Sequence, residues 1–178
     1  MSYVIDADVL DRDDAAAICA AVFDLVRSDL RSMGIDVYSD YRDDEMPEPV
    51  LAAQARLNAL IRRRHTKRSA PDISLSLTPD DPEWADAELY APWSICVSGY
   101  ATPHASTEWL VDLDDCGMSV VVALTHEDAA VLRDRVAHLA PLVPLADVHR
   151  RRREHRRQAR ATRRTARRTT LKRLLHLP

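Results

Sequence analysis

The chain has 178 residues, of which 46% are apolar and 5% aromatic. This apolar share is enough for one compact core, which excludes disorder throughout, and no run approaches the roughly 20 apolar residues that cross a bilayer. Charge divides the chain: residues 1 to 148 hold 12 Lys or Arg against 27 Asp or Glu, whereas residues 149 to 178 hold 13 against 1. An acidic body at −15 is therefore followed by a basic tail at +12.

The N-terminal segment has the pattern of a strand followed by a helix. Residues 3 to 5 predict a short strand, and the acidic run at residues 11 to 14 suits the positive end of a helix dipole. Apolar residues then recur at spacings of three and four, and Gly34 supplies a stop. We predict a helix over residues 12 to 33.

A second strand and helix follow. Residues 35 to 38 predict a short strand, and residues 40 to 48 form an acidic loop. Pro49 suits the first turn of a helix, and the three arginines at residues 62 to 64 complement the negative end of its dipole. We predict a helix from Pro49 to about residue 66.

The apolar period changes to two at residues 73 to 78, which predicts a strand with one solvated face. Residues 79 to 92 combine prolines and acids with Trp84, and we interpret them as a long loop whose length is typical of a binding surface. Because acids surround Trp84, base stacking there is unfavourable, and a basic protein is the expected partner of this loop.

Three more strands are predicted at residues 93 to 100, 107 to 113 and 118 to 124, the last two joined by a tight turn. Thr125 then caps a third helix that ends before Pro141. The predicted fold is α+β, with an antiparallel meander of about four strands packed with three helices, plus a C-terminal Arg-rich helix. We divide the chain into an acidic domain at residues 1 to 144 and a basic helical tail at residues 145 to 178.

The basic tail lacks Gly and Pro from residue 147 to 177, which predicts one long helix. It lacks an apolar face, and we expect its arginines to surround the axis, so it needs solvent or a charged partner. Phosphates relieve such repulsion by counterion release, so we predict contact with a DNA or RNA backbone over residues 149 to 173, without sequence preference. The predicted binding residues are Arg150, Arg151, Arg152, Arg153, Arg156, Arg157, Arg160, Arg163, Arg164, Arg167, Arg168, Lys172 and Arg173.

Other interpretations of the tail stay open. It can be a solvated tail, a clamp on its own acidic body, or a helix that docks on an acidic protein. An anionic membrane surface is less favoured, because the four leucines between residues 171 and 177 offer little apolar area. A second basic cluster at residues 62 to 68 either extends the same surface or only compensates the dipole of its helix.

Enzymatic and metal chemistry have weak support. The three glycines are isolated, so phosphate-cradling loops are absent, and we predict no cofactor. The spacing of Cys96, His104, Cys116 and His126 matches no compact zinc motif, and we predict no metal site. Whether His104 and His126 form a site with nearby carboxylates stays open.

The chain begins without the basic start and apolar run of a signal peptide, so we expect a cytoplasmic protein with reduced thiols. The leading hypothesis is a non-enzymatic bacterial or phage accessory protein, whose tail binds nucleic acid nonspecifically while its acidic body binds a protein partner. The alternative is a protein-interaction module of the inhibitor or immunity type, which acts through its acidic surface and has no nucleic-acid role.

Overall fold

The computed structural model describes residues 1 to 7, 10 to 64, 73 to 102 and 109 to 174, with only the helical backbone at 161, 162 and 164 to 174. Its strands are β1 (Ser2–Ile5), β2 (Ser32–Asp36), β3 (Ser74–Leu77), β4 (Cys96–Tyr100), β5 (Trp109–Asp114), β6 (Ser119–Ala123) and β7 (Leu142–Pro144). Its helices are α1 (Arg12–Val26), α2 (Glu48–Arg64), α3 (Trp84–Tyr90), α4 (His126–Val136) and α5 (Leu145–Leu174), with 3-10 turns η1 (Asp43–Glu45) and η2 (Ala91–Trp93).

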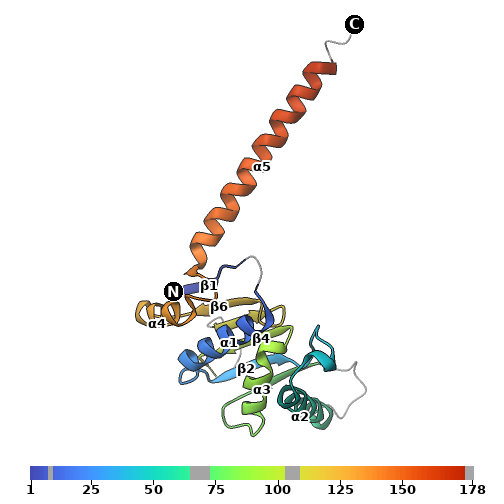
Figure 1. Ribbon diagram of the computed structural model, residues 1–178, viewed down its shortest axis with the longest axis vertical. Helices are drawn as coiled ribbons and strands as arrows, with labels where there is room; N and C mark the ends of the chain where they lie inside the picture. Colours follow the sequence, from blue (N-terminus) through green and yellow to red (C-terminus); the bar gives the residue numbers. More distant parts are fainter. Residues whose placement is uncertain (8–9, 65–72, 103–108, 175–178) are drawn as a thin grey trace. The chain divides into compact units, whose positions relative to one another are not determined.

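The described strands form one sheet in the order β3-β2-β4-β5-β6-β1-β7, and every pair whose register is defined is antiparallel (Figure 1). The expected α+β class is confirmed. The expected counts of about four strands and three body helices are too low. Strands β1 and β2 belong to the same sheet as the predicted meander of β4, β5 and β6. Strand β7 and helix α3 were not predicted, because each is short and leaves little signal in the sequence.

One face of the sheet carries the apolar side chains of the core. The strand register places Leu75, Ile35, Val97, Leu113 and Val120 in one row across five strands, and all five are buried. Buried residues of α1, α2, α3 and α4 belong to the same hydrophobic cluster, so these helices pack on this face. Because strand side chains alternate between faces, the polar residues between these positions lie on the opposite side.

The predicted helix over residues 12 to 33 is wrong at its end, since α1 stops at Val26. The backbone N–H of Leu30 still donates to the carbonyl of Val26 at 3.0 Å, in a turn that keeps the helical spacing of four. Buried Met33 then belongs to β2, and Gly34, the expected helix stop, lies inside that strand opposite Ser98. The apolar spacing therefore continues through a turn into a strand.

The predicted long loop over residues 79 to 92 is also wrong, because it contains α3 and η2. Pro82 precedes α3 and Pro92 follows it, so neither proline interrupts the helix. The buried residues Ala87 and Tyr90 are three apart and face the core. A helix of seven residues has too few apolar repeats for the period to stand out.

Local signals did identify other boundaries. Helix α1 begins with Asp11 accepting a hydrogen bond from the N–H of Asp14 at 2.8 Å, and α4 begins with Thr125 accepting from the N–H of Asp128 at 3.1 Å. The turn between β5 and β6 carries Asp115 and Cys116 at positive φ before Gly117. The expected end of the second helix near residue 66 lies outside the described residues.

The chain divides into two compact units, Met1–Val143 and Pro144–Pro178. The first contains the sheet from β3 to β1 and the helices α1 to α4, and the second contains α5. Helix α5 runs without a break from Leu145 to Leu174, which corresponds to about 45 Å of helix (Figure 1).

Candidate nucleic-acid interface

All thirteen predicted binding residues lie in α5. The side chains that the structure describes in this set are exposed: Arg150, Arg151, Arg152, Arg153, Arg156, Arg157, Arg160 and Arg163. The remaining five, Arg164, Arg167, Arg168, Lys172 and Arg173, lie where the helical backbone is described. The predicted set is therefore presented by a single helix.

The register of α5 gathers these arginines on one side. At about 100° per residue, every arginine with a described side chain except Arg151 falls within an arc of about 160°, together with His149. We call this surface the basic face; it consists of His149, Arg150, Arg152, Arg153, Arg156, Arg157, Arg160 and Arg163. Positions 164, 167 and 168 continue the same spacing along the helix.

The expectation that the arginines surround the helix axis holds for residues 150 to 153 and not for the arginines with described side chains that follow them. The four consecutive arginines at residues 150 to 153 occupy every side of one turn and hide the period that the following arginines keep. The opposite side of the helix carries Arg151 together with Glu154, His155 and Gln158. Helix α5 thus has most of its described positive charge on one side, although it has no apolar stripe.

A hollow of about 330 Å³ lies on the basic face between His149, Arg152, Arg153 and Arg156. The Nε of Arg153 donates to the carbonyl of His149 at 3.2 Å. The predicted set misses His149, although its spacing of three, four and seven residues to these arginines is the signal that identifies it. The hollow leaves space between cationic groups for an anionic ligand.

Little negative charge lies within α5 to neutralise this face. Asp147 and Glu154 are the acids between residues 145 and 174. The carboxylate of Asp147 lies 3.1 Å from Nη1 of Arg150, one turn along the helix. Because such an exposed pair is weak, the basic face keeps most of its positive potential.

The second basic cluster of the body is engaged with the acidic segment that contains α3. Nη2 of Arg64 lies 2.9 Å from Asp81, and Nη2 of Arg63 lies 2.6 Å from Glu83. The pKa of Asp81 is lowered, first by the backbone N–H of Thr78 and further by Arg64. Arg63 and Arg64 are therefore paired with acids of the body, and Lys67 and Arg68 lie outside the described residues.

The other acids of α3 also have partners within the body. Arg56 contacts both carboxylate oxygens of Asp86, at 2.7 and 2.6 Å, and Arg27 contacts both of Glu88 at 3.0 Å. The indole N–H of Trp84 donates to Glu88 at 3.0 Å. These acids hold α3 against α2 and the end of α1, and Trp84 packs against the core. The expected basic protein partner of this segment stays a prediction.

An acidic surface does remain on the face of the sheet opposite the core. Ser98 lies between Gly34 and Asp112 in the register and donates to Asp112 at 2.9 Å. Burial raises the pKa of Asp114, and the neighbouring charges of Asp112 and Asp115 raise it further. The strand positions on this face include no Lys or Arg among the described residues, so its potential is negative.

Three side chains of the body are candidates for chemistry: His104, His126 and Cys19. Nδ1 of His126 lies 3.1 Å from the hydroxyl of Tyr3. His104 lies outside the described residues, so the suggested site of these two histidines stays open. Within the described ranges no group of three His, Cys, Asp or Glu side chains converges as a metal site. Burial raises the pKa of the Cys19 thiol to about 12, which keeps it protonated and a poor nucleophile.

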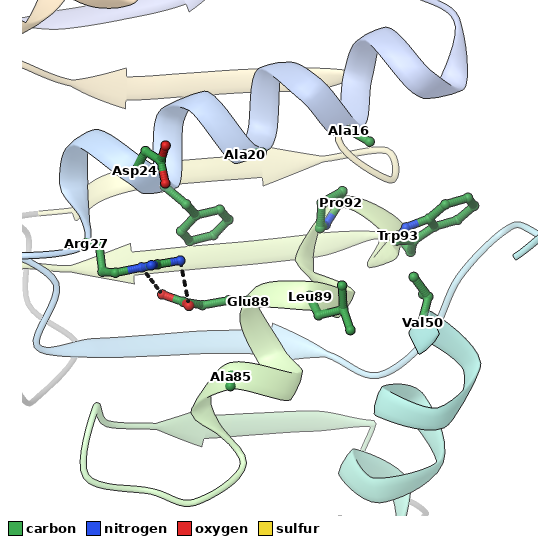
Figure 2. A pocket seen from close by; sticks show the side chains of 11 residues that line it. Ala16, Ala20, Asp24, Arg27, Val50, Ala85, Glu88, Leu89, Pro92 and Trp93 are labelled. Atoms are coloured by element: carbon green, nitrogen blue, oxygen red, sulfur yellow. Dashed lines mark hydrogen bonds and ion pairs between the residues drawn. The ribbon is translucent and has the colours of Figure 1, made fainter. Parts of the chain in front are cut away.

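A groove of about 390 Å³ lies between α1 and α3. Figure 2 shows Ala16 and Ala20 of α1 above it, Leu89 of α3 below it, and the Arg27–Glu88 pair at one end. Of its charged side chains, Arg27 pairs with Glu88 and Asp24 pairs with Arg135 outside the groove, and no nucleophile in the lining lies beside a base. The lining therefore lacks the convergent polar groups of a catalytic site.

Comparison with known proteins finds no match: no family model, no curated protein and no solved structure matches this chain. Among the helices in the described part of the chain, none has both the length and the apolar composition needed to cross a membrane.

Proposed function

We propose that this protein binds the phosphate backbone of nucleic acid through the basic face of α5, without sequence preference, while its body binds a protein partner. The observation that carries the proposal is the concentration of exposed arginines on one side of an unbroken helix. Each phosphate neutralised by such a cation releases condensed counterions, which drives binding. Phosphate contacts carry no sequence information, so the expected binding is nonspecific.

The composition of α5 favours this proposal over a membrane surface. An interfacial helix buries an apolar face opposite its charged face. The side of α5 opposite the basic face instead presents Arg151, Glu154, His155 and Gln158, none of which is apolar. A polyanion that is itself solvated matches a helix with one cationic side and one polar side.

A four-site variant tests the proposal. Replacing Arg152, Arg156, Arg160 and Arg163 with Gln removes positive charge from the basic face and retains good helix formers. We expect affinity for a labelled duplex, measured by fluorescence anisotropy, to fall at least about tenfold at low salt. The slope of log K against log salt should become shallower by about 3 to 4, because each lost phosphate contact removes about 0.9.

A matched control removes the same charge from the body. Arg31, Arg42, Arg133 and Arg135 are exposed, and their joint replacement with Gln changes the net charge by the same amount. This control should leave both the affinity and the salt slope close to wild type. If the tail variant binds as wild type does, or if the control weakens binding equally, the basic face is not the nucleic-acid interface.

A second candidate function is a protein-interaction module that acts through its acidic surface alone. The acidic sheet face around Asp112 and Asp114 favours it, since the acids of residues 81 to 88 are already paired within the body. The tail variant separates the two candidates. Retention of nucleic acid depends on α5 in the first, whereas the second predicts no retention by the wild-type protein.

A further inference from the structure

We infer that the polyanion which α5 fits is duplex DNA of B form, with the helix lying along the major groove; this inference rests on the proposed function. An α-helix with side chains is about 10 to 12 Å across, and the major groove of B-DNA is about 12 Å wide. Residues 149 to 168 cover about 29 Å of the helix, which corresponds to about 8 base pairs at 3.4 Å each.

The width of the basic face matches a groove with two anionic walls. Arg152 and Arg163 lie on one flank of the arc, and Arg150 and Arg157 lie on the other, with Arg156 between them. A single row of phosphates needs only a narrow seam of cations. In a major groove, each flank of the helix faces the phosphates of a different strand, so both flanks are used.

The side chains at the N-terminal half of this face are spread apart. His149, Arg152, Arg153 and Arg156 leave the hollow of about 330 Å³ between them. Arg153 is held toward the helix by its bond to the carbonyl of His149. The cations that line the hollow therefore have open space between them, into which a phosphate group can enter.

Single strands are a poorer fit to this helix. Proteins that bind them without sequence preference stack successive bases on aromatic side chains. Residues 145 to 178 contain no Phe, Trp or Tyr. Helix α5 thus offers single strands only charge, whereas it offers a duplex both charge and a shape that enters the groove.

Duplex RNA does not fit α5 because of the shape of its grooves, and not because of its charge. The major groove of an A-form helix is deep and narrow, and its minor groove is wide and shallow. A helix of this diameter cannot enter the former and cannot place both flanks against phosphate in the latter. Because duplex RNA is also densely charged, it is the probe that separates groove shape from electrostatics.

The test is a full-length variant that moves three arginines off the basic face without changing composition. Arg156→His is combined with His155→Arg, Arg160→Gln with Gln158→Arg, and Arg163→Thr with Thr162→Arg. Net charge and residue content are unchanged, and the three cations move toward the opposite side of the helix. Circular dichroism verifies that the helix content is retained.

The probes are a duplex DNA of about 20 base pairs, the single strand of the same sequence and the duplex RNA equivalent, compared at about 0.15 M salt. Wild type should bind duplex DNA at least about tenfold more tightly than either other probe. The rearranged variant should lose about tenfold for duplex DNA and nothing for the single strand. Dimethyl sulfate should show protection of guanine N7, which lies in the major groove, with the wild type alone.

Equal affinity of wild type for the three probes, or unchanged duplex binding by the rearranged variant, would overturn the inference. In either case, loss of binding by the four-Gln variant would show that the proposed function stands without groove recognition. If the four-Gln variant binds all probes as wild type does, the proposed function fails, and the inference fails with it.

Discussion

Arg12, the first residue of α1, is a cation held in the body without a carboxylate partner among the described residues. Its guanidinium lies 4.0 Å from the ring centre of Trp93 and 5.4 Å from that of Tyr41, and Nη1 donates to the carbonyl of Cys116 at 2.7 Å. Its Nε and Nη2 are buried and have no hydrogen-bond partner in the described part of the chain. Cation–π attraction and one charged hydrogen bond therefore offset its desolvation.

Replacing Arg12 with Ala should lower the free energy of unfolding by about 2 to 3 kcal/mol, because it removes the stacking and leaves the carbonyl of Cys116 without its donor. Arg12→Met, which keeps the packing, should cost less. Urea denaturation measures both. Arg133→Ala, at an exposed position, is the control and should change stability by under about 0.5 kcal/mol. A cost for Arg12→Ala as small as that of the control would contradict this account.

At the scale of single residues, the sequence predicts which residues bind but not how they are arranged on the helix. Their identity follows from residue type alone, since thirteen Lys or Arg lie in thirty residues at the C-terminal end. Their arrangement does not, because the adjacent arginines at residues 150 to 153 mask the helical period. His149 belongs to the basic face by position and not by formal charge, which is why a count of cations misses it.

At the scale of elements, two glycines on neighbouring strands have different roles. A side chain at Gly99 of β4 would begin 2.6 Å from Leu30 Cδ2 and 2.7 Å from Val111 Cγ1, so its absence allows the turn after α1 to lie on the sheet. A side chain at Gly34 of β2 would meet its nearest atom, the carbonyl oxygen of Ser98, at 3.8 Å. One glycine is required by packing and the other is not.

We expect Gly99→Ala to destabilise the protein by about 1 to 3 kcal/mol, since the overpacked core must shift. Gly34→Ala is the matched control, and it should be neutral or slightly stabilising because alanine reduces the entropy of the unfolded chain. Thermal unfolding of both variants provides the comparison. Similar melting temperatures for the two variants would show that contact with Leu30 and Val111 does not decide the cost.

The elements that the sequence predicts well are those with local causes. Residues adjacent in the sequence determine the Thr125 cap, the turn that ends at Gly117 and the alternation of buried and exposed residues in β3. The elements that it misses depend on distant partners. Helix α3 is held by ion pairs to α1 and α2, and β7 is only three residues long at the edge of the sheet, so neither leaves a periodic signal.

At the scale of the whole molecule, the core belongs to one of the two units. The buried hydrophobic cluster of the described residues runs from Tyr3 to Leu142, so it lies entirely within Met1–Val143. The order of the strands from β3 to β1 within that unit could not be predicted, because it depends on pairings between distant segments, such as Tyr3 with Val122, more than 100 residues apart.

Deleting residues 149 to 178 should therefore leave the stability of the body nearly unchanged. We expect the melting temperature to stay within about 3 °C of wild type, corresponding to about 1 kcal/mol. Nucleic-acid retention should disappear in the same preparation. Differential scanning calorimetry and a filter-binding assay measure the two properties, and a large fall in melting temperature would show that the second unit supports the core.

The interior place of β1 also affects how the chain assembles during synthesis. Tyr3 pairs with Val122 of β6, and the ammonium of Met1 donates to the carbonyl of Leu124 at 3.0 Å. At about 5 to 20 residues per second, a ribosome needs roughly 6 to 24 s to make the intervening segment. During that interval β1 has neither of its neighbours in the sheet and exposes unpaired backbone. Strand β1 is thus placed in the sheet only after β6 and β7, the strands on either side of it, have been made.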